Sequence, residues 1–492
     1  MAFASWNPCA TVLSISWTSF RATEAIEFSR VEQAMKSTIL CCAAIITIFA
    51  SRQISVTAQT SVSATQTPVH PDQGVSKEVA KLNKRGLDHF TKKQYDEAIR
   101  LFRKALDLQP DSPDVLNNLG KALDAVGNDG EAIEGFDKAL KLAPENAIIH
   151  SNKGLALFHE KKFEESIASY RKAIEIDANF AQAQNGLGAA LFSLGRTEEA
   201  ISAFQKVVQL DPKNTDAQNN LGTALMSQHK AEEAIPFFRK ANRLKPDSVE
   251  FLENYASALE EAGRQDEAIA AHVRLVTRHP GQASAWAHLG HLLYMAKRYD
   301  KASVALKKSL KLKQDQPEVA LTLGLAQYGQ GKNSEAIRSF EQSLSLKPDD
   351  FHALCGLGSA YYSKKDYLKA TASYEKALAQ KPDSPEALAG LGASQLESKQ
   401  LDEAIATYQK LIPLQPDNPD NQINVGTALF NKGRFQDAAE SYREAIRLKP
   451  DMARAHYNLG MALHRLNDRN SAQAEFEQAH RLDSSLKPPV GR

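Results

Sequence analysis

The chain of 492 residues carries 60 lysines and arginines and 59 aspartates and glutamates, so its formal net charge at pH 7 is +1. A chain with so little net charge lacks the broad basic surface that binds nucleic acid or an anionic membrane, and we expect neither as a partner of the folded chain. Of the four cysteines, Cys9, Cys41 and Cys42 lie near the amino end, which leaves Cys355 without a partner for an internal disulfide in the rest of the chain.

An apolar stretch runs from Ile39 to Ala50, shortly after Met35 and Lys36. It is shorter than the roughly 20 residues that a membrane-spanning helix needs, and its length suits the hydrophobic region of a secretory signal peptide. Small residues up to Ala58 offer a cleavage site. We therefore predict an exported or periplasmic protein of a bacterial envelope. An inner-membrane anchor formed by residues 39–50 and a cytoplasmic location are the alternatives.

This interpretation divides the amino end into three segments. Residues 1–34 are an upstream extension before a true start at Met35. Residues 35–58 are a signal peptide or membrane anchor, and residues 59–78 are a polar, flexible linker. Contact with a membrane is expected only through the apolar segment, if it is not cleaved.

Beyond the linker, glycine recurs every 34 residues, and such a period indicates a repeat array rather than one globular domain. The only interruption is Ala256, where one more glycine is due. The glycines are Gly86, Gly120, Gly154, Gly188, Gly222, Gly290, Gly324, Gly358, Gly392, Gly426 and Gly460.

Alanine, an aromatic ring and proline keep the same phase, as in Ala132, Phe136 and Pro144 after Gly120. Glycine in a first helix and alanine in a second helix let two backbones approach closely, and the ring fills the space beside them. Proline ends the second helix, because it lacks an amide proton and disfavours helical geometry in the preceding residue. A unit of this kind cannot bury its apolar face alone, so neighbouring units must stack.

The pattern closely resembles the tetratricopeptide repeat, through stretches such as Asn117-Asn118-Leu119-Gly120 followed by Ala132, Phe136, Ala139 and Pro144. The resemblance implies an all-α fold, a right-handed superhelical solenoid of helix-turn-helix repeats with a concave inner surface. A short tail, 487–492, follows the array. The twelve expected repeats are 79–112, 113–146, 147–180, 181–214, 215–248, 249–282, 283–316, 317–350, 351–384, 385–418, 419–452 and 453–486.

Six places of each first helix fall on one sector, which lines the concave groove in the family. One of these places often holds asparagine, whose amide can both donate to and accept from the backbone of an extended peptide. The row resembles the asparagine ladder in the tetratricopeptide arm of O-linked N-acetylglucosamine transferases. The alternative is that these side chains bond adjacent helices. The asparagines are Asn118, Asn152, Asn220, Asn254, Asn424 and Asn458.

Aromatic rings follow the other margin of the sector, where they can hold apolar side chains of a peptide or simply pack against the neighbouring repeat. The rings predicted for the peptide groove are Phe158, Phe192, Tyr294, Tyr328 and Tyr362. Glu250, Glu253, Glu260 and Glu261 make the groove of the sixth repeat acidic, which favours a ligand with a basic segment. Arg454, His464 and Arg465 make the last repeat basic.

The sixth and seventh repeats depart most from the pattern, and a local change in superhelix pitch is one interpretation. Ala256 replaces glycine, and His272 and Leu306 replace rings. His288 and His291 lie three residues apart, but we interpret them as surface residues and predict no metal site and no cofactor.

The sequence therefore predicts a non-enzymatic protein-protein interaction scaffold that binds an extended segment of an unidentified partner protein. No Walker-type loop, dinucleotide-binding fingerprint or nucleophile elbow occurs in the chain. Two alternatives remain: a targeting subunit of a glycosyltransferase or other enzyme complex, and a chaperone-type adaptor. The adaptor would need a lysine clamp, for which Lys84 and Lys121 are the nearest substitutes. A homo-oligomer through the end repeats is also open.

Overall fold

The computed structural model describes residues 73–486, and every regular element in this part of the chain is a helix. The predicted upstream extension, signal segment and carboxyl-terminal tail lie outside the described residues. Among residues 73–486, no helix has both the length and the apolar character that crossing a membrane requires.

The helices alternate between the first and the second helix of each repeat. The first helices are α2 (Gln73–Thr91), α4 (Pro113–Asp124), α6 (Ala147–His159), α8 (Ala181–Ser193), α10 (Thr215–Met226), α12 (Val249–Glu261), α14 (Ala283–Met295), α16 (Pro317–Gly329), α18 (Phe351–Ser363), α20 (Pro385–Glu397), α22 (Pro419–Asn431) and α24 (Ala453–Arg465). From α4 onward, each begins at an expected repeat start. Because α2 already begins at Gln73, residues 73–78 are helical and do not belong to the flexible linker.

The second helices are α3 (Tyr95–Leu108), α5 (Asp129–Leu142), α7 (Phe163–Ile176), α9 (Thr197–Leu210), α11 (Ala231–Leu244), α13 (Gln265–Arg278), α15 (Tyr299–Leu312), α17 (Asn333–Leu346), α19 (Tyr367–Gln380), α21 (Leu401–Leu411), α23 (Phe435–Leu448) and α25 (Arg469–Leu482). Helix α21 is shorter than the others and continues as a 3-10 turn, η1 (Ile412–Leu414). Pro413 explains this early end, because it cannot donate the backbone bond that an α-helix requires there.

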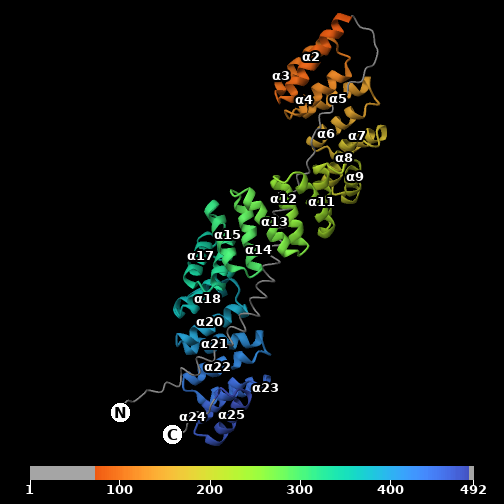
Figure 1. Cartoon of the computed structure of the whole chain (residues 1–492). Coiled ribbons are helices and arrows are strands. Elements are labelled where there is room, and N and C mark those ends of the chain that lie inside the picture. Colours follow the sequence, from red (N-terminus) through yellow and green to blue (C-terminus); the bar gives the residue numbers. More distant parts are fainter. Residues whose placement is uncertain (1–72, 487–492) are drawn as a thin grey trace. The chain divides into compact units, whose positions relative to one another are not determined.

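The described chain consists of two compact units, an amino-terminal unit (residues 73–279, α2–α13) and a carboxyl-terminal unit (residues 280–486, α14–α25). In each unit, a first helix packs on the second helix of its own repeat, and that second helix packs on the next first helix (Figure 1). This arrangement confirms the predicted fold class, the all-α, right-handed superhelical solenoid of helix pairs. The boundary between the units falls between the sixth and seventh repeats, where the motif departs most.

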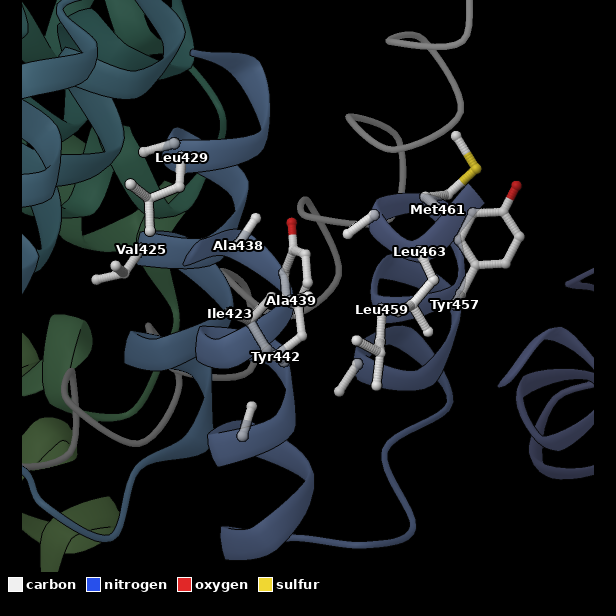
Figure 2. Close-up of a cluster of buried hydrophobic side chains, with 14 of the residues drawn as sticks. Ile423, Val425, Leu429, Ala438, Ala439, Tyr442, Tyr457, Leu459, Met461 and Leu463 are labelled. Atoms are coloured by element: carbon white, nitrogen blue, oxygen red, sulfur yellow. The ribbon is translucent and has the colours of Figure 1, made fainter. Parts of the chain in front are cut away.

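The repeated glycine, alanine and ring form the core of each repeat, as the sequence predicts. Phe136 and Ala132 are completely buried. A Cβ atom on Gly120 would lie 2.6 Å from Cε1 of Phe136, so only glycine lets the ring approach that closely. Figure 2 shows the equivalent core in the eleventh and twelfth repeats, a cluster of buried side chains from α22, α23 and α24 that includes Tyr442.

The departures of the sixth and seventh repeats are compensated locally. Leu306 takes the place of the ring and lies against Gly290, where a Cβ would come within 2.5 Å of the leucine Cγ. In the sixth repeat, Ala256 and His272 are both buried. An imidazole is smaller than a phenyl ring, which leaves room for the methyl group of the alanine.

The turn between the two helices of every described repeat contains one residue in the left-handed region, with φ between 56° and 82°. Such a residue ends a helix, because its backbone leaves the helical path. Glycine adopts this conformation without strain, whereas the lysines here pay a steric cost. The residues are Lys93, Gly127, Lys161, Gly195, His229, Gly263, Lys297, Gly331, Lys365, Lys399, Gly433 and Asn467.

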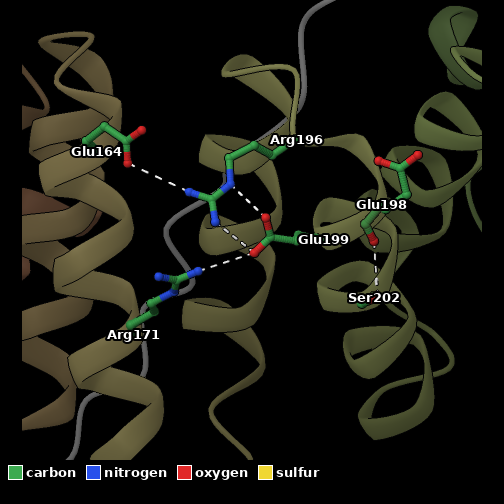
Figure 3. Close-up of polar contacts among 6 residues, drawn as sticks. All are labelled: Glu164, Arg171, Arg196, Glu198, Glu199 and Ser202. Atoms are coloured by element: carbon green, nitrogen blue, oxygen red, sulfur yellow. Dashed lines mark hydrogen bonds and ion pairs between the residues drawn. The ribbon is translucent and has the colours of Figure 1, made fainter.

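Ion pairs link neighbouring repeats on the outer surface. Arg196 lies 2.7 Å from Glu199 in its own repeat and 3.8 Å from Glu164 in the preceding one, and Arg171 lies 3.3 Å from Glu199 (Figure 3). These side chains are largely exposed to solvent. Such pairs contribute little to stability, because water and salt screen them.

Candidate functional site

The first helices form the inner face of each unit. Consecutive first helices contact one another, as α4 does with α6 and α16 with α18, whereas each second helix packs chiefly on first helices. The more closely spaced layer of a curved stack lies on its concave side. We define the inner face by six places of each first helix, those six, three and two residues before the repeated glycine and those one, four and five residues after it. This is therefore the surface on which an extended ligand would lie.

The asparagines predicted for peptide binding instead bond one repeat to the next. The Nδ2 atom of Asn152 donates to Oδ1 of Asn117 at 2.8 Å, and that of Asn254 donates to Oδ1 of Asn219 at 2.9 Å. Asn118 bonds Asn83 and Asn220 bonds Asn185 in the same way. Asn152, Asn220 and Asn458 are buried, while Asn118, Asn254 and Asn424 are half-buried. Four of the six asparagines therefore bond adjacent first helices, which is the alternative to peptide binding given above. Contact of this row with a peptide stays a prediction.

Glycine interrupts the asparagine row where the preceding ring reaches the inner face. A Cβ on Gly186 would lie 2.2 Å from Cζ of Tyr170, and one on Gly390 would lie 2.3 Å from Cζ of Tyr374. The hydroxyl of Tyr374 lies 2.9 Å from Oγ of Ser359, a residue of the inner face. The glycine gaps in the row therefore have a steric cause.

Three of the five predicted groove rings contact a ring of their own repeat. Each of the three lies at the end of a first helix and contacts the ring five residues later, at the start of the second helix. Centroid distances are 5.4 Å for Phe158 and Phe163, 5.8 Å for Tyr294 and Tyr299, and 5.4 Å for Tyr362 and Tyr367. The hydroxyl of Tyr328 lies 3.2 Å from Oγ of Ser363, and Phe192 is half-buried. Their contact with a peptide stays a prediction.

The four glutamates of the acidic patch fall into two pairs. Glu260 lies 2.5 Å from Nε2 of the buried His272, and Glu261 lies 3.2 Å from Nδ1 of His229. The carboxylate of Glu250 accepts a hydrogen bond from Nδ2 of Asn219 at 3.0 Å. Burial raises the pKa of Glu250 and of Glu253. For Glu253, nearby His272 opposes this rise and the negative charge of Glu250 adds to it.

The two arginines of the last repeat already have partners, whereas His464 is exposed. Arg454 is nearly buried, burial lowers the pKa of its guanidinium, and its Nη2 lies 3.0 Å from Oδ1 of Asp420. Arg465 lies over the ring of Phe435, with its Cζ 4.3 Å from the centroid. His288 on α14 is exposed and His291 is half-buried.

A pocket of about 410 Å³, which the sequence did not predict, lies on the inner face of the first three repeats. Lys121 on its wall lies 5.4 Å from the centroid of the Phe90 ring, and burial lowers the pKa of its amine. At one end, Nδ1 of His159 lies 2.8 Å from Oδ1 of Asp124, and this contact raises the pKa of His159. Burial, followed by the charge of Asp124, raises the pKa of Asp129. No spacing motif marks these residues, because His159 belongs to the next repeat.

Tetratricopeptide repeat models match most of the chain. The matched segments are residues 86–127, 122–179, 159–280, 259–325, 321–385, 361–422, 426–467 and 453–485. No curated protein matches the sequence.

Several solved structures resemble parts of the chain. YrrB, described as a TPR protein with an unusual peptide-binding site, is 27% identical, with a TM-score of 0.36, and the alignment covers 38% of this chain and 96% of YrrB. MamA is 28% identical, with a TM-score of 0.31, and the alignment covers 33% of this chain and 94% of MamA. The pilF protein of Pseudomonas aeruginosa is 19% identical, with a TM-score of 0.39, and the alignment covers 43% of this chain and 96% of that protein.

Proposed function

Because this chain belongs to the tetratricopeptide repeat family, we propose that it is a non-enzymatic scaffold that holds an extended segment of a partner protein on its inner face. Stacked helix pairs give an elongated surface built from rigid elements, which suits a segment that lacks its own fold. The sequence contains none of the catalytic motifs sought above. The ligand chemistry follows from the inner face itself.

The observation that carries the proposal is the pair of carboxylates Glu250 and Glu253 on α12, of which Glu250 is exposed and Glu253 is half-buried. Neither forms an ion pair with another described residue, and burial raises the pKa of both, so their charged forms are poorly solvated. A lysine or arginine of a bound segment would neutralise them and regain the lost electrostatic energy. The segment therefore carries basic residues where it crosses the sixth repeat.

The test is the affinity of the full chain for extended peptides selected from an unbiased library. We expect the selected peptides to be rich in lysine and arginine. The double change Glu250→Gln and Glu253→Gln keeps an oxygen that can accept from Asn219 but removes both charges. It should weaken binding roughly tenfold, since a pair with the exposed Glu250 contributes up to about 1 kcal/mol and one with the half-buried Glu253 about 1 kcal/mol or more.

The matched control is Glu134→Gln with Glu233→Gln, which removes the same charge from exposed places on the second helices α5 and α11. It should leave peptide affinity unchanged. Selection of acidic or purely apolar peptides, or equal loss of affinity in both double variants, would contradict a basic ligand on the inner face.

We also propose that the scaffold works in the bacterial envelope, on the basis of the apolar stretch 39–50 and the small residues before its predicted cleavage site. Cell fractionation with amino-terminal sequencing tests this. We expect a mature chain outside the cytoplasm that begins after Ala58. An intact chain that begins at Ala2 or Phe3 and stays in the cytosol would refute both export and the start at Met35.

A further inference from the structure

The repeats provide an internal comparison at the junction of their two helices. In five repeats, the twelfth and seventeenth residues are aromatic rings in contact, such as Phe90 with Tyr95 and Phe430 with Phe435, with centroids 5.4 and 5.2 Å apart. In the second repeat the same two places hold Asp124 and Asp129. Two carboxylates gain nothing from the packing that holds the rings together, and they repel each other unless a proton or a cation lies between them.

A histidine completes this cluster from the next repeat. Asp124 ends α4, Asp129 begins α5 and His159 ends α6. One oxygen of each carboxylate and one ring nitrogen all lie within 4.8 Å of one another. The neighbouring Glu160 is held by Lys162, whose Nζ lies 2.6 Å from it, so it does not compete for this place.

Two buried polar atoms, one in the cluster and one on α7 near Asp124, lack a hydrogen-bond partner among the described residues. One is Oδ1 of Asp129, and the other is the hydroxyl of Tyr170, whose side chain is 1% exposed. In the ninth repeat the equivalent hydroxyl, of Tyr374, bonds an inner-face serine. In the third repeat that serine is replaced by Leu155, which lines the same pocket as Asp124 and His159. The Tyr170 hydroxyl therefore lacks that serine partner, and the charge of Asp124 adds to the effect of burial in raising its pKa.

We propose that Asp124, Asp129 and His159 bind a divalent metal ion of the zinc class, which joins the second repeat to the third. Carboxylate oxygens and imidazole nitrogens are zinc ligands, with bonds of about 2.0–2.2 Å. A tetrahedral ion of that size places its ligand atoms roughly 3.3 Å apart. The three atoms lie within 4.8 Å of one another in the structure, so binding would draw them together by about 1.5 Å at most. Three protein ligands leave one position for water, which can be the partner of the Tyr170 hydroxyl, or for an atom of a bound segment.

This inference does not depend on peptide binding and is tested with Zn²⁺ alone. Equilibrium dialysis of the full chain should give one saturable ion of higher affinity than any other. Co²⁺ at the same site should show the visible absorption of a site with imidazole ligation, and Zn²⁺ should abolish it. Loss of an outer-shell partner alone weakens metal sites roughly 10- to 100-fold. Asp124→Asn with Asp129→Asn should therefore weaken binding at least tenfold, and so should His159→Ser.

The repeats also supply a variant that keeps the fold. Asp124→Phe with Asp129→Phe recreates the ring pair of Phe158 and Phe163, so it should fold without metal and lose the Co²⁺ absorption. His159→Ser introduces the residue that the fourth repeat has at the equivalent place, Ser193. If the double phenylalanine variant fails to fold, the affinity of the His159→Ser variant for Zn²⁺ still tests the proposal.

The chain has 13 histidines, so other sites must be separated from this one. His288→Ala with His291→Ala should leave the first binding event unchanged. The proposal is wrong if the wild-type chain binds no Zn²⁺ up to millimolar concentrations. It is equally wrong if the aspartate and histidine variants bind the first ion as tightly as the wild type, which would mean an adventitious ion only.

Discussion

The main effect of changing Asn118, Asn152, Asn220 and Asn254 together to alanine should be a loss of stability in the amino-terminal unit, whether or not these residues bind a ligand. Each side chain donates to an asparagine of the preceding repeat, at 3.0, 2.8, 3.3 and 2.9 Å. Losing such a bond and leaving its acceptor unsatisfied costs about 1.5–2.5 kcal/mol, from which the better helix propensity of alanine subtracts up to about 0.7 kcal/mol. Each site therefore loses about 1–2 kcal/mol.

The four bonds involve separate pairs, so their contributions add. The sum of about 4–8 kcal/mol is a large part of the 5–15 kcal/mol by which a typical domain is stable. Urea unfolding followed by circular dichroism measures the loss. Hydrogen exchange then locates it, with fast exchange expected in residues 73–279 and unchanged exchange in residues 280–486.

The control is Asn431→Ala, which removes an exposed asparagine at the end of α22 and should leave stability unchanged or slightly higher. A quadruple variant that is as stable as the wild type but no longer binds a peptide ligand would refute this reasoning. The asparagine row would then belong to the ligand-binding site, and the bonds between repeats would contribute nothing measurable.

Two further predictions test the packing and the helix caps. Gly186→Ala should destabilise the chain by about 1–3 kcal/mol, because the added Cβ would lie 2.2 Å from Cζ of the buried Tyr170. Gly281→Ala is the control and should be neutral, because a Cβ there would meet no atom within 4 Å. The urea midpoints of the two variants measure the difference. Asp350 caps α18 and lies 2.8 Å from Nζ of Lys347; burial tends to raise its pKa, but these two partners outweigh burial and lower it. Asp350→Ala should cost about 1 kcal/mol at pH 7. The pKa of Asp350 in the folded chain lies below its unfolded value near 3.9. The difference in the free energy of unfolding between wild type and variant should therefore be largest above about pH 3.9 and should decrease as the pH falls through the folded pKa. Urea titrations at several pH values measure this difference.

The sequence predicted the fold well because the packing rule of the repeat depends on residue size and phase. Gly120 and Phe136 can be paired from their spacing alone, and the helix starts follow from the same phase. The left-handed residue in each turn was missed. Five of the twelve are glycines, but lysine or another residue occupies the same place in the remaining repeats. The left-handed backbone conformation therefore recurs in every described repeat, but the residue type that adopts it does not.

The inner face was harder to predict, because exposure on a helix sector depends on how closely the next helix approaches. Asn152 belongs to the correct sector, but α4 lies so close to α6 that its amide is buried against Asn117. The sequence did contain a sign of this pairing. Asn83, Asn117, Asn185 and Asn219 each precede one of the four bonded asparagines by 35 residues, one more than the repeat period.

The same internal comparison separates structural residues from functional ones. Every repeat must solve one packing problem, so a residue type that recurs at one place and bonds the next repeat is explained by that problem alone. The asparagine row is of this kind. Asp124 and Asp129 are of the opposite kind, because they replace two rings in contact by two like charges and leave Oδ1 of Asp129 buried without a partner among the described residues. Packing makes such a replacement unfavourable. A cation that binds the folded state and not the unfolded one offsets this cost, because its binding free energy adds to the stability of the fold.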